Sequence, residues 1–331
     1  MTADDLYPLR FEPMFQYRLW GGRDLGDFMH TALPGDDPIG EAWILSDRAD
    51  FASKIENGAL AGRTLTDLMR ARKGDVLGRQ AARFDRFPLL LKFLDVEKML
   101  SVQVHPRDDQ TDLIPAGDTG KTEAWVVLRT KPEGRIYAGL KPGTTAQDLR
   151  ALNADSADSH LASFKPEAGQ AVMIEAGTVH SLGDGVMVFE VQENSDVTFR
   201  LYDWNHVDAK TGQPRPLQVE QALASVDFDQ GAILPVQPRL EAVQPARSER
   251  VFHNAHFDLK RWQGSHAFDV GAPGEARVLV CVDGAGRVRG ADQDVEMKRG
   301  DAVLLPAAVG AGRFVPDGAV TLFEIAVGEH L

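Results

Sequence analysis

The chain has 331 residues, of which 43% are hydrophobic and 26% are charged. This composition is typical of a folded globular protein and excludes a disordered chain, a collagen and a small disulfide scaffold, and the length suggests about two domains. With 36 Lys and Arg against 49 Asp and Glu, the formal charge is −13. A general nucleic-acid binder is therefore not expected, because that role needs a basic surface.

Cys281 is the only cysteine. A lone thiol excludes an intrachain disulfide and a cysteine-based zinc site, and it suits a reducing compartment. No segment reaches the 18 apolar residues that a membrane span requires. The acidic start, residues 1–5, lacks the basic-then-apolar order of a signal peptide. We therefore expect a cytoplasmic protein, acting as a monomer and away from membranes.

Short apolar runs between Gly, Asn and Asp residues predict that most of the chain is β-strand. In chain order, these runs are 87–94, 100–105, 125–128, 171–174, 186–191, 277–282 and 302–305. Helices are expected at 64–72, capped by Thr64, at 144–153, capped by Thr144, and at 217–225. Many short strands with a few inserted helices favour a β-sandwich or jelly roll over a parallel βαβ sheet.

A weak internal repeat links the two halves of the chain. Gly169 and Gly300 each precede a short apolar strand and then a tight turn. The turn of the first copy leads to His180, and its spacing resembles the second motif of cupins, whereas the equivalent position of the second copy is Ala311. The repeat predicts two jelly-roll modules, of which only the first can bind a metal.

Residues 229–250 contain one glycine and three prolines with little periodicity, so they are the best linker candidate. We expect residues 1–230 to form a metal-binding catalytic cupin domain with a helical insertion. Residues 231–331 are expected to form a degenerate, cupin-like β domain.

Residues 100–105 alternate between apolar and polar side chains, and side chains two apart share one face of a strand. Leu100, Val102 and Val104 are thus expected in a core, and the opposite face carries Ser101, Gln103 and His105. That polar face either contacts solvent or lines a cavity. His105 favours the cavity, because imidazole is the commonest metal ligand.

Lys121 and Glu123 also share a face at the start of an extended segment. They form either a surface ion pair of little energetic value or a site where Glu123 binds a metal and Lys121 an anion. His180, taken alone, suits a structural role equally well. Together with Gln103 and His105, these residues offer a nitrogen and oxygen ligand set that suits Zn²⁺ and also Mn²⁺, Fe²⁺, Co²⁺ or Ni²⁺.

Residues 190–204 hold four acidic groups and Arg200 around an expected strand–turn–strand. Arginine is the side chain best suited to planar, multi-donor binding of an oxyanion. A charged hairpin edge explains Glu193 well, but it explains less well why Tyr202, Asp203 and Trp204 follow Arg200 so closely.

Seven strings in this sequence occur together and in the order found in one enzyme family. They are Trp20-Gly21-Gly22, Gly40-Glu41-Ala42-Trp43, Phe87-Pro88-Leu89-Leu90-Leu91-Lys92, Leu100-Ser101-Val102-Gln103-Val104-His105-Pro106, Gly120-Lys121-Thr122-Glu123-Ala124-Trp125, Ala176-Gly177-Thr178-Val179-His180 and Arg200-Leu201-Tyr202-Asp203-Trp204. The sequence thereby resembles the type I mannose-6-phosphate isomerase family in its short bacterial form, over about residues 7–206. The last third of the chain contains none of these seven strings, so the resemblance there is weak.

The resemblance implies a cupin-fold zinc enzyme, with one Zn²⁺ per chain, that interconverts mannose 6-phosphate and fructose 6-phosphate. It implies that the zinc ligands are Gln103, His105, Glu123 and His180. It further implies an active-site arginine at Arg200, substrate contacts near the phosphate by Lys121 and Ser101, and active-site carboxylates at Glu190 and Asp196. This chain departs from the family at Asn205-His206, where Gly-Arg is common, and at Val126, where an aromatic residue is frequent.

Such an isomerisation moves a proton between C1 and C2 through an enediol, so it needs a base, a stabilised oxyanion and a phosphate anchor. We therefore expect a basic cavity floor within an otherwise acidic surface. Two alternatives stay open: another metal-cupin enzyme, such as a different sugar isomerase or an oxygenase, and a non-catalytic sugar-binding protein. The presence of all four expected ligands argues against the second alternative.

Overall fold

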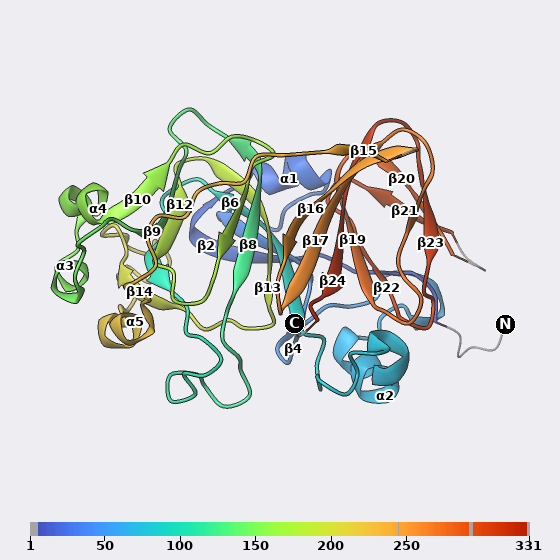
Figure 1. Ribbon diagram of the computed structural model, residues 1–331, viewed down its shortest axis with the longest axis horizontal. Helices are drawn as coiled ribbons and strands as arrows, with labels where there is room; N and C mark the ends of the chain where they lie inside the picture. The colour runs from blue at the N-terminus through green and yellow to red at the C-terminus, as the bar shows by residue number, and fades with distance from the viewer. Residues whose placement is uncertain (1–5, 244, 291–293, 330–331) are drawn as a thin grey trace.

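The computed structural model describes residues 6–243, 245–290 and 294–329. Its four main sheets follow one another across the molecule as two β-sandwiches placed side by side (Figure 1). The first sandwich pairs a five-stranded sheet, in the order β10 (Leu161–Phe164), β9 (Arg135–Leu140), β12 (His180–Gly183), β7 (Val102–Val104) and β14 (Phe199–Tyr202), with a six-stranded sheet, in the order β11 (Ala171–Ile174), β8 (Glu123–Thr130), β13 (Val186–Glu193), β6 (Leu89–Val96), β2 (Met14–Gly22) and β3 (Ile39–Leu45).

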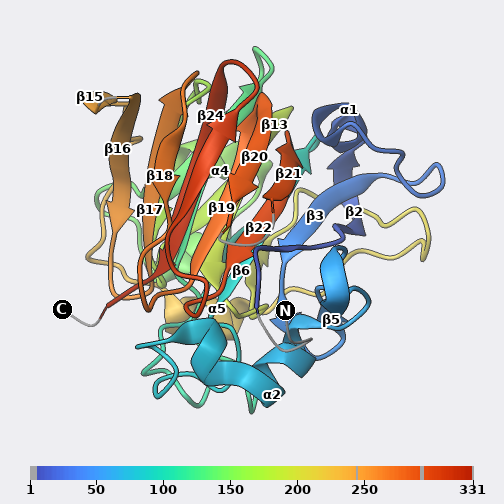
Figure 2. The same ribbon diagram turned by 90° about the vertical axis from the view of Figure 1, so that its right-hand side faces the viewer.

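The second sandwich is built mainly from the C-terminal part of the chain. Its larger sheet has the order β1 (Leu9–Arg10), β22 (Ala302–Leu305), β19 (Arg277–Asp283), β24 (Val320–Val327), β17 (Phe257–Gly264), β16 (Ala246–His253) and β15 (Glu241–Val243). Figure 2 shows this sheet from its outer side, partly behind the smaller one. The smaller sheet has the order β18 (Phe268–Val270), β23 (Gly312–Pro316), β20 (Ala285–Arg289) and β21 (Asp294–Lys298).

The remaining elements cover edges and ends of the two sandwiches. They are the hairpin β4 (Asp47–Arg48) and β5 (Phe51–Ala52), a 3₁₀ turn at Gly58–Leu60, and the helices α1 (Asp24–Met29), α2 (Leu65–Leu77), α3 (Ala146–Arg150), α4 (Ala154–His160) and α5 (Val219–Ser225). Helices α3, α4 and α5 lie on the outer face of the five-stranded sheet, where their apolar residues share one core cluster with β7 and β14.

The largest core lies where the two sandwiches meet. Phe93 and Phe189 of the six-stranded sheet pack against Phe257 and Phe323 of the seven-stranded sheet, and the rings of Phe189 and Phe323 have centroids 5.1 Å apart. All four phenylalanines are at most 1% exposed, and burying each such side chain contributes about 1.5–3 kcal/mol. This apolar interface holds the two sandwiches together as one structure.

The mostly β fold with a few inserted helices is confirmed, and each predicted strand run coincides with a strand of the structure. The helix predicted at 64–72 is α2, where Thr64 and Asp67 form a capping box, although the helix continues to Leu77. The helix predicted at 144–153 is shorter, and its cap is Thr145. Thr144 was the wrong choice because its hydroxyl donates to the carbonyl of His160 instead.

The internal repeat has a structural counterpart. Gly169 and Gly300 adopt φ angles of 92° and 96°, a left-handed conformation that favours glycine. Each glycine turn is followed by a four-residue strand, β11 or β22, and then by a turn. The next strand of the first copy begins at His180, and that of the second begins at Gly312, directly after Ala311.

The predicted linker at 229–250 is wrong over its second half, because β15 and the start of β16 form a hairpin there. Its first half lies on the first sandwich, where the amide of Ile233 donates to the carbonyl of Ala138 at 3.0 Å. The N-terminal strand β1 pairs with β22 of the second sandwich. The domain boundary expected at residue 231 stays a prediction. Strand β1 belongs to the N-terminal side of this boundary in the sequence but pairs with β22 on the C-terminal side.

Within the described ranges, no helix has the length and apolar character needed to cross a membrane. The single cysteine, Cys281, is a buried free thiol. Burial raises the pKa of this thiol to about 12, so it is unreactive in the folded chain.

Asp95 provides a pH-dependent element of stability. Its buried carboxylate accepts the backbone N–H of Asp24, at the start of α1, at 2.7 Å. Burial raises the pKa of Asp95 to about 6, above the value of about 3.9 in an unfolded chain. The folded state therefore holds this proton to higher pH, and the contribution of Asp95 to stability falls as the pH rises from about 4 to about 6.

We expect Asp95→Asn, which keeps an acceptor oxygen but cannot ionise, to gain stability relative to the wild type as the pH rises. The difference in free energy of unfolding should change by about 2 kcal/mol between pH 4 and pH 7, measured by urea unfolding. Comparing the two proteins at each pH cancels the titration of all other groups. A difference that stays constant with pH would show that Asp95 ionises normally.

Candidate active site

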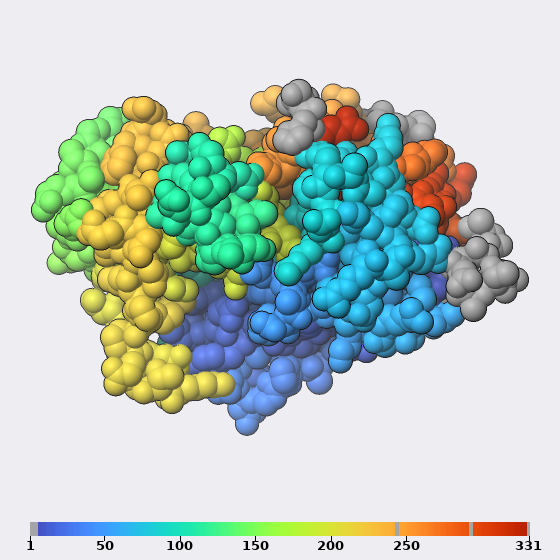
Figure 3. Space-filling model, turned by 90° about the horizontal axis from the view of Figure 1, so that it is seen from below, coloured from blue at the N-terminus to red at the C-terminus, as the bar shows by residue number. Residues whose placement is uncertain are grey.

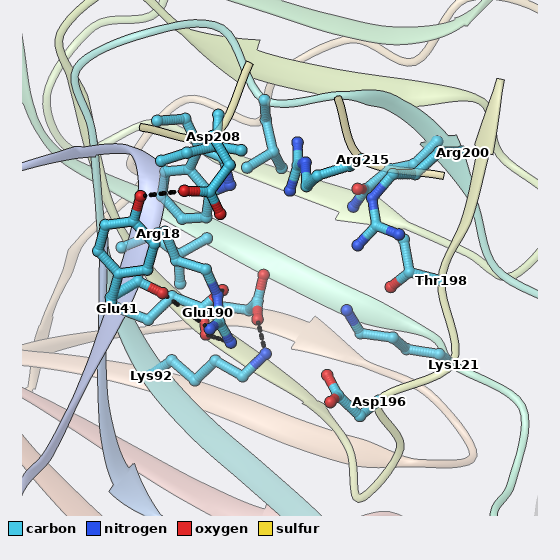
Figure 4. Close-up of a pocket in the computed structure, with 16 residues that line it drawn as sticks. Arg18, Glu41, Lys92, Lys121, Glu190, Asp196, Thr198, Arg200, Asp208 and Arg215 are labelled. Atoms are coloured by element: carbon cyan, nitrogen blue, oxygen red, sulfur yellow. Dashed lines mark hydrogen bonds and ion pairs between the residues drawn. The ribbon is translucent and has the colours of Figure 1, made fainter. Parts of the chain in front are cut away.

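A cavity of about 480 Å³ opens at one end of the first sandwich. Strands β2, β3, β6, β13 and β14 and the segment after β14 contribute its walls (Figure 4). Its charged lining residues are Arg18, Glu41, Lys92, Lys121, Glu190, Asp196, Arg200, Asp208 and Arg215, and Gln103 also reaches it.

Beside this cavity, the ends of three strands bring His105, Glu123 and His180 together. His180 is the first residue of β12 and pairs with Gln103 of β7, whereas Glu123 is the first residue of β8. One ligand atom from each of His105, Glu123 and His180 lies within 4.8 Å of the others, and all three residues are buried. The Nε2 atoms of His105 and His180 lie 3.5 and 3.6 Å from the two carboxylate oxygens of Glu123.

The hydrogen bonds of both histidines orient the rings for metal binding. The Nδ1–H of His105 donates to the carbonyl of Val197 at 2.8 Å, and that of His180 donates to the carbonyl of Thr178 at 2.9 Å. Each Nε2 therefore directs a lone pair toward Glu123, as in many metal sites. Burial lowers the pKa of both rings, that of His105 to about 3, which keeps them in the neutral, ligating form.

These residues fit a divalent cation. His105 Nε2 is buried and has no hydrogen-bond partner among the described residues, which is costly unless a ligand satisfies it. Burial alone would raise the pKa of Glu123, but the charge of Lys121, whose Nζ lies 2.7 Å from Glu123 Oε2, holds this pKa well below its usual range. The carboxylate therefore stays ionised, as a metal ligand must.

Gln103 can complete the ligand set. Its amide nitrogen lies 3.1 Å from His180 Nε2, and its amide oxygen accepts the hydroxyl of Ser101 at 3.0 Å. An amide turned over has the same shape and would direct its oxygen at the cluster, and the Ser101 hydroxyl would then accept from it. The structure thus gathers all four predicted ligands, with the imidazole centroids of His105 and His180 4.8 Å apart. Substrate contact by Ser101, which is 1% exposed, stays a prediction.

Two buried carboxylates line the cavity on β3 and β13, which both pair with β6, and their surroundings differ. Glu41 is held by Arg18 through two contacts of 3.0 Å and by the indole N–H of Trp43 at 2.7 Å. Burial alone would raise the pKa of Glu41, but the charges of Arg18 and Lys92 lower it to about 2. Glu41 is therefore a permanent anion.

Glu190 is held by Lys92 at 3.0 Å and by the indole N–H of Trp125 at 3.0 Å. Here burial and the charge of Glu123 raise the pKa. Two carboxylates in one site whose pKa values shift in opposite directions suit different roles. Of the two, Glu190 is the carboxylate whose pKa is raised.

Arg200 differs from the other cations of the cavity. Arg18, Lys92 and Lys121 each pair with a glutamate of the site, and Arg215 pairs with Asp203. Arg200 makes no ion pair with any described residue, and its buried Nε has no hydrogen-bond partner there. Figure 4 shows Arg200 and Lys121 on the side of the cavity opposite Arg18. An anionic ligand in the cavity would find Arg200 free.

The cavity wall carries both signs of charge, with five cations and four carboxylates among its charged lining residues. The cations expected for a basic floor are present, but carboxylates accompany them, because each buried cation other than Arg200 needs a carboxylate partner. Sequence reasoning gave no role to Arg18, Glu41, Lys92 or Arg215. The available signal was a charge within an otherwise apolar strand, as at Glu41 in IGEAWIL and Lys92 in LLLKFLDV.

The segment after β14 borders the cavity and is fastened to the N-terminal strands. Tyr17 donates its hydroxyl to Asp208 at 2.8 Å, and the ammonium group of Lys210 lies 2.6 Å from Asp37 and 3.9 Å from the Tyr17 ring centroid. Figure 3 shows this yellow segment beside the blue N-terminal strands. His206, in the departure noted above, lies 3.9 Å from Asp203 and is not among the residues that line the cavity.

Fold and cluster together define a cupin-like β-sandwich protein whose strand ends can hold a divalent metal. Residues 9–136 match the family model described as phosphomannose isomerase type I, catalytic domain. Mannose-6-phosphate isomerase ManA of Bacillus subtilis (strain 168) is 30% identical over 94% of this chain and 96% of its own length. The probable mannose-6-phosphate isomerase GmuF of the same strain is 32% identical over 92% of this chain and 95% of its own length.

The chain therefore belongs to the type I mannose-6-phosphate isomerase family and is an isomerase, as its motifs indicated. The crystal structure of the Bacillus subtilis mannose 6-phosphate isomerase covers 98% of this chain and 99% of its own, with a TM-score of 0.87 at 26% identity. A structure described as mannose 6-phosphate isomerase, holo and zinc bound, has a TM-score of 0.77 at 17% identity, covering 97% and 99% of the two chains, and shows the same fold.

The pairing of Lys92 with Glu190 can be tested by stability. Both side chains are 4% exposed, so Lys92→Met leaves a buried carboxylate without its cation. We expect a loss of about 3–5 kcal/mol in the free energy of unfolding at pH 7, and Lys92→Met/Glu190→Gln should recover part of it. Lys73→Met removes an exposed ion pair with Asp85 and should change stability little. Equal losses in the single and double variants would contradict the pairing.

Proposed function

We propose that the protein interconverts mannose 6-phosphate and fructose 6-phosphate with the help of one divalent cation, Zn²⁺. The observation that carries this proposal is the convergence of two neutral histidines and an ionised, buried glutamate beside a polar cavity that offers an unpaired arginine. The printed names of the relatives support the choice of substrate.

The cation would be held by Gln103, His105, Glu123 and His180. Two imidazole nitrogens, a carboxylate and an amide oxygen form a nitrogen and oxygen ligand set that zinc accepts. When bound, the cation supplies Lewis-acid polarisation of the oxygens near C1 and C2 of the sugar.

The proton moves by way of a carboxylate of the chain. Glu190 takes the proton from C2 of the open-chain aldose, and the C1 carbonyl oxygen becomes an enediol oxygen. The proton of the O2 hydroxyl passes to O1, and Glu190 returns its proton to C1, which leaves the C2 carbonyl of the ketose. Lys92 and the indole of Trp125 fix the orientation of Glu190. Asp196, which is exposed at the cavity, is the second candidate for this role.

The cations on one wall stabilise the negative charges of the substrate. The unpaired Arg200 is the group available to the oxyanion of the enediol, because a preorganised donor needs no rearrangement when charge develops. Lys121 lies on the same side (Figure 4) and is proposed to bind the phosphate by charge-assisted hydrogen bonds. The permanent ion pair of Arg18 and Glu41 shapes the opposite wall.

Turnover of mannose 6-phosphate by the purified protein with added Zn²⁺ tests the proposal directly. We expect fructose 6-phosphate as the product, and no comparable turnover of glucose 6-phosphate or unphosphorylated mannose. Treatment with a chelator should abolish activity, and Zn²⁺ should restore it. His105→Ala should hold less than one equivalent of metal in elemental analysis. Full activity in a sample verified as metal-free would refute the metal assignment.

Arg200→Ala tests the stabilisation of the developing charge. We expect kcat to fall by about 10²–10³-fold, the effect typical of removing one oxyanion donor, with an unchanged circular dichroism spectrum. Arg289→Ala removes a surface arginine of β20 that is 52% exposed and should leave kcat unchanged. If Arg200→Ala turned over substrate at nearly the wild-type rate, Arg200 would have no chemical role.

A further inference from the structure

A second cavity, of about 290 Å³, lies at the junction of the two sandwiches. It borders the segment 120–123, which delivers Lys121 and Glu123 to the active site from the other side. Its lining includes Asp108, Thr122, Glu175, Glu193, Asn254 and His256. Residues from both modules therefore meet behind the loop that carries two of the proposed site residues.

Glu193, the last residue of β13, holds both backbone groups of Thr122. Its amide donates to the Thr122 carbonyl at 3.1 Å, and its carboxylate Oε2 accepts the Thr122 N–H at 2.7 Å. Glu193 is 8% exposed, so these bonds are shielded from water. Because Thr122 lies between Lys121 and Glu123, this double contact fixes the peptide that joins two site residues.

The preceding residues of the loop are held in the same way. The N–H of Gly120 donates to the carboxylate of Asp108 at 2.8 Å, and that of Lys121 donates to the carbonyl of Pro106 at 3.1 Å. A Cβ on Gly120 would come within 2.6 Å of the amide nitrogen of Asp108, so this close approach requires glycine. Each backbone N–H from Gly120 to Thr122 thus has a defined acceptor.

The second oxygen of Glu193 is held by the C-terminal module. Nδ1 of His256, in the turn between β16 and β17, lies 3.1 Å from Glu193 Oε1. The amide of His256 donates to Asn254 at 2.8 Å, and its carbonyl accepts from Gly328 at 2.8 Å, so the turn itself is fixed. Asp108, Glu193 and His256 form a metal-sized group, but both carboxylates already accept a backbone N–H, which favours a positioning role.

We propose that Glu193 is a positioning residue of the isomerase, which sets Lys121 and Glu123 through Thr122 and is itself fixed by His256 of the second module. The inference rests on the function proposed above. A small displacement of a reacting group costs about 10²-fold in rate, and loss of an interaction that orients a metal ligand costs about 10–100-fold in metal affinity. The second module would thereby contribute to the active site without touching the substrate.

The test compares Glu193→Ala with Glu193→Gln. Glutamine keeps an oxygen that can accept the Thr122 N–H, whereas alanine does not. We expect Glu193→Ala to lower kcat for mannose 6-phosphate and Zn²⁺ affinity by at least about tenfold each, with a smaller change in KM. Glu193→Gln should stay within about threefold of the wild type in both. Zn²⁺ affinity is measured by competition with a chromophoric chelator, independently of turnover.

Glu175→Gln is the matched control. Glu175 lines the same cavity and is exposed, and its carboxylate makes no ion pair with any described residue, so neither kcat nor Zn²⁺ affinity should change. His256→Ala retains Glu193 but frees its second oxygen, and should lower both quantities less than Glu193→Ala does. This variant also keeps the inference testable if Glu193→Ala fails to fold.

Three outcomes would overturn the inference. The first is a folded Glu193→Ala with wild-type kcat and Zn²⁺ affinity. The second is an equal loss in Glu193→Gln and Glu193→Ala, which would mean that the hydrogen bond to Thr122 is not what matters. The third, where Glu193→Ala does not fold, is a folded His256→Ala that matches the wild type. If the wild type itself fails to turn over mannose 6-phosphate, the proposed function is wrong, and Zn²⁺ affinity still decides the positioning role.

Discussion

The structure depends on one buried charge, the carboxylate of Glu123. A charge removed from water is costly unless partners compensate for it, and this carboxylate is 1% exposed. Lys121 and the two neutral imidazoles of His105 and His180 surround it, and each imidazole directs a lone pair rather than a proton toward it. A cation held among these groups would satisfy the unpartnered Nε2 of His105 and face the charge of Glu123, so the cluster fits a metal.

Strand geometry makes this arrangement possible. The four predicted ligands come from three strands that end at the same side of the sandwich, and register pairs His180 with Gln103 and Gln192 with Glu123. The hydrogen bonds that orient His105 and His180 go to the backbone carbonyls of Val197 and Thr178, whose positions follow from the fold. The positions of the expected ligands are therefore set by the fold, and displacing a strand end would move one of them.

The sequence was sufficient to predict those features that depend on neighbouring residues in the chain. Alternation predicted β7, and the strings around Gln103, Glu123 and His180 predicted a cluster that the structure brings together. It was not sufficient where partners come from distant strands. The residues around Glu41 do not indicate that Arg18 is its ion-pair partner. The charge of Lys92 within LLLKFLDV is explained only by the structure, which places Glu190 of β13 beside it. The incorrect helix cap at Thr144 has the same origin, because its hydroxyl is used by the carbonyl of His160.

The second sandwich supports the first through packing. Ala311 stands where the first copy has His180, so this copy cannot assemble the same cluster. Its seven-stranded sheet instead covers the apolar face of the catalytic sandwich through Phe257 and Phe323, which water would otherwise contact. The turn before Phe257 also places His256 beside Glu193. The apolar packing and the contact of His256 with Glu193 thus belong to one interface.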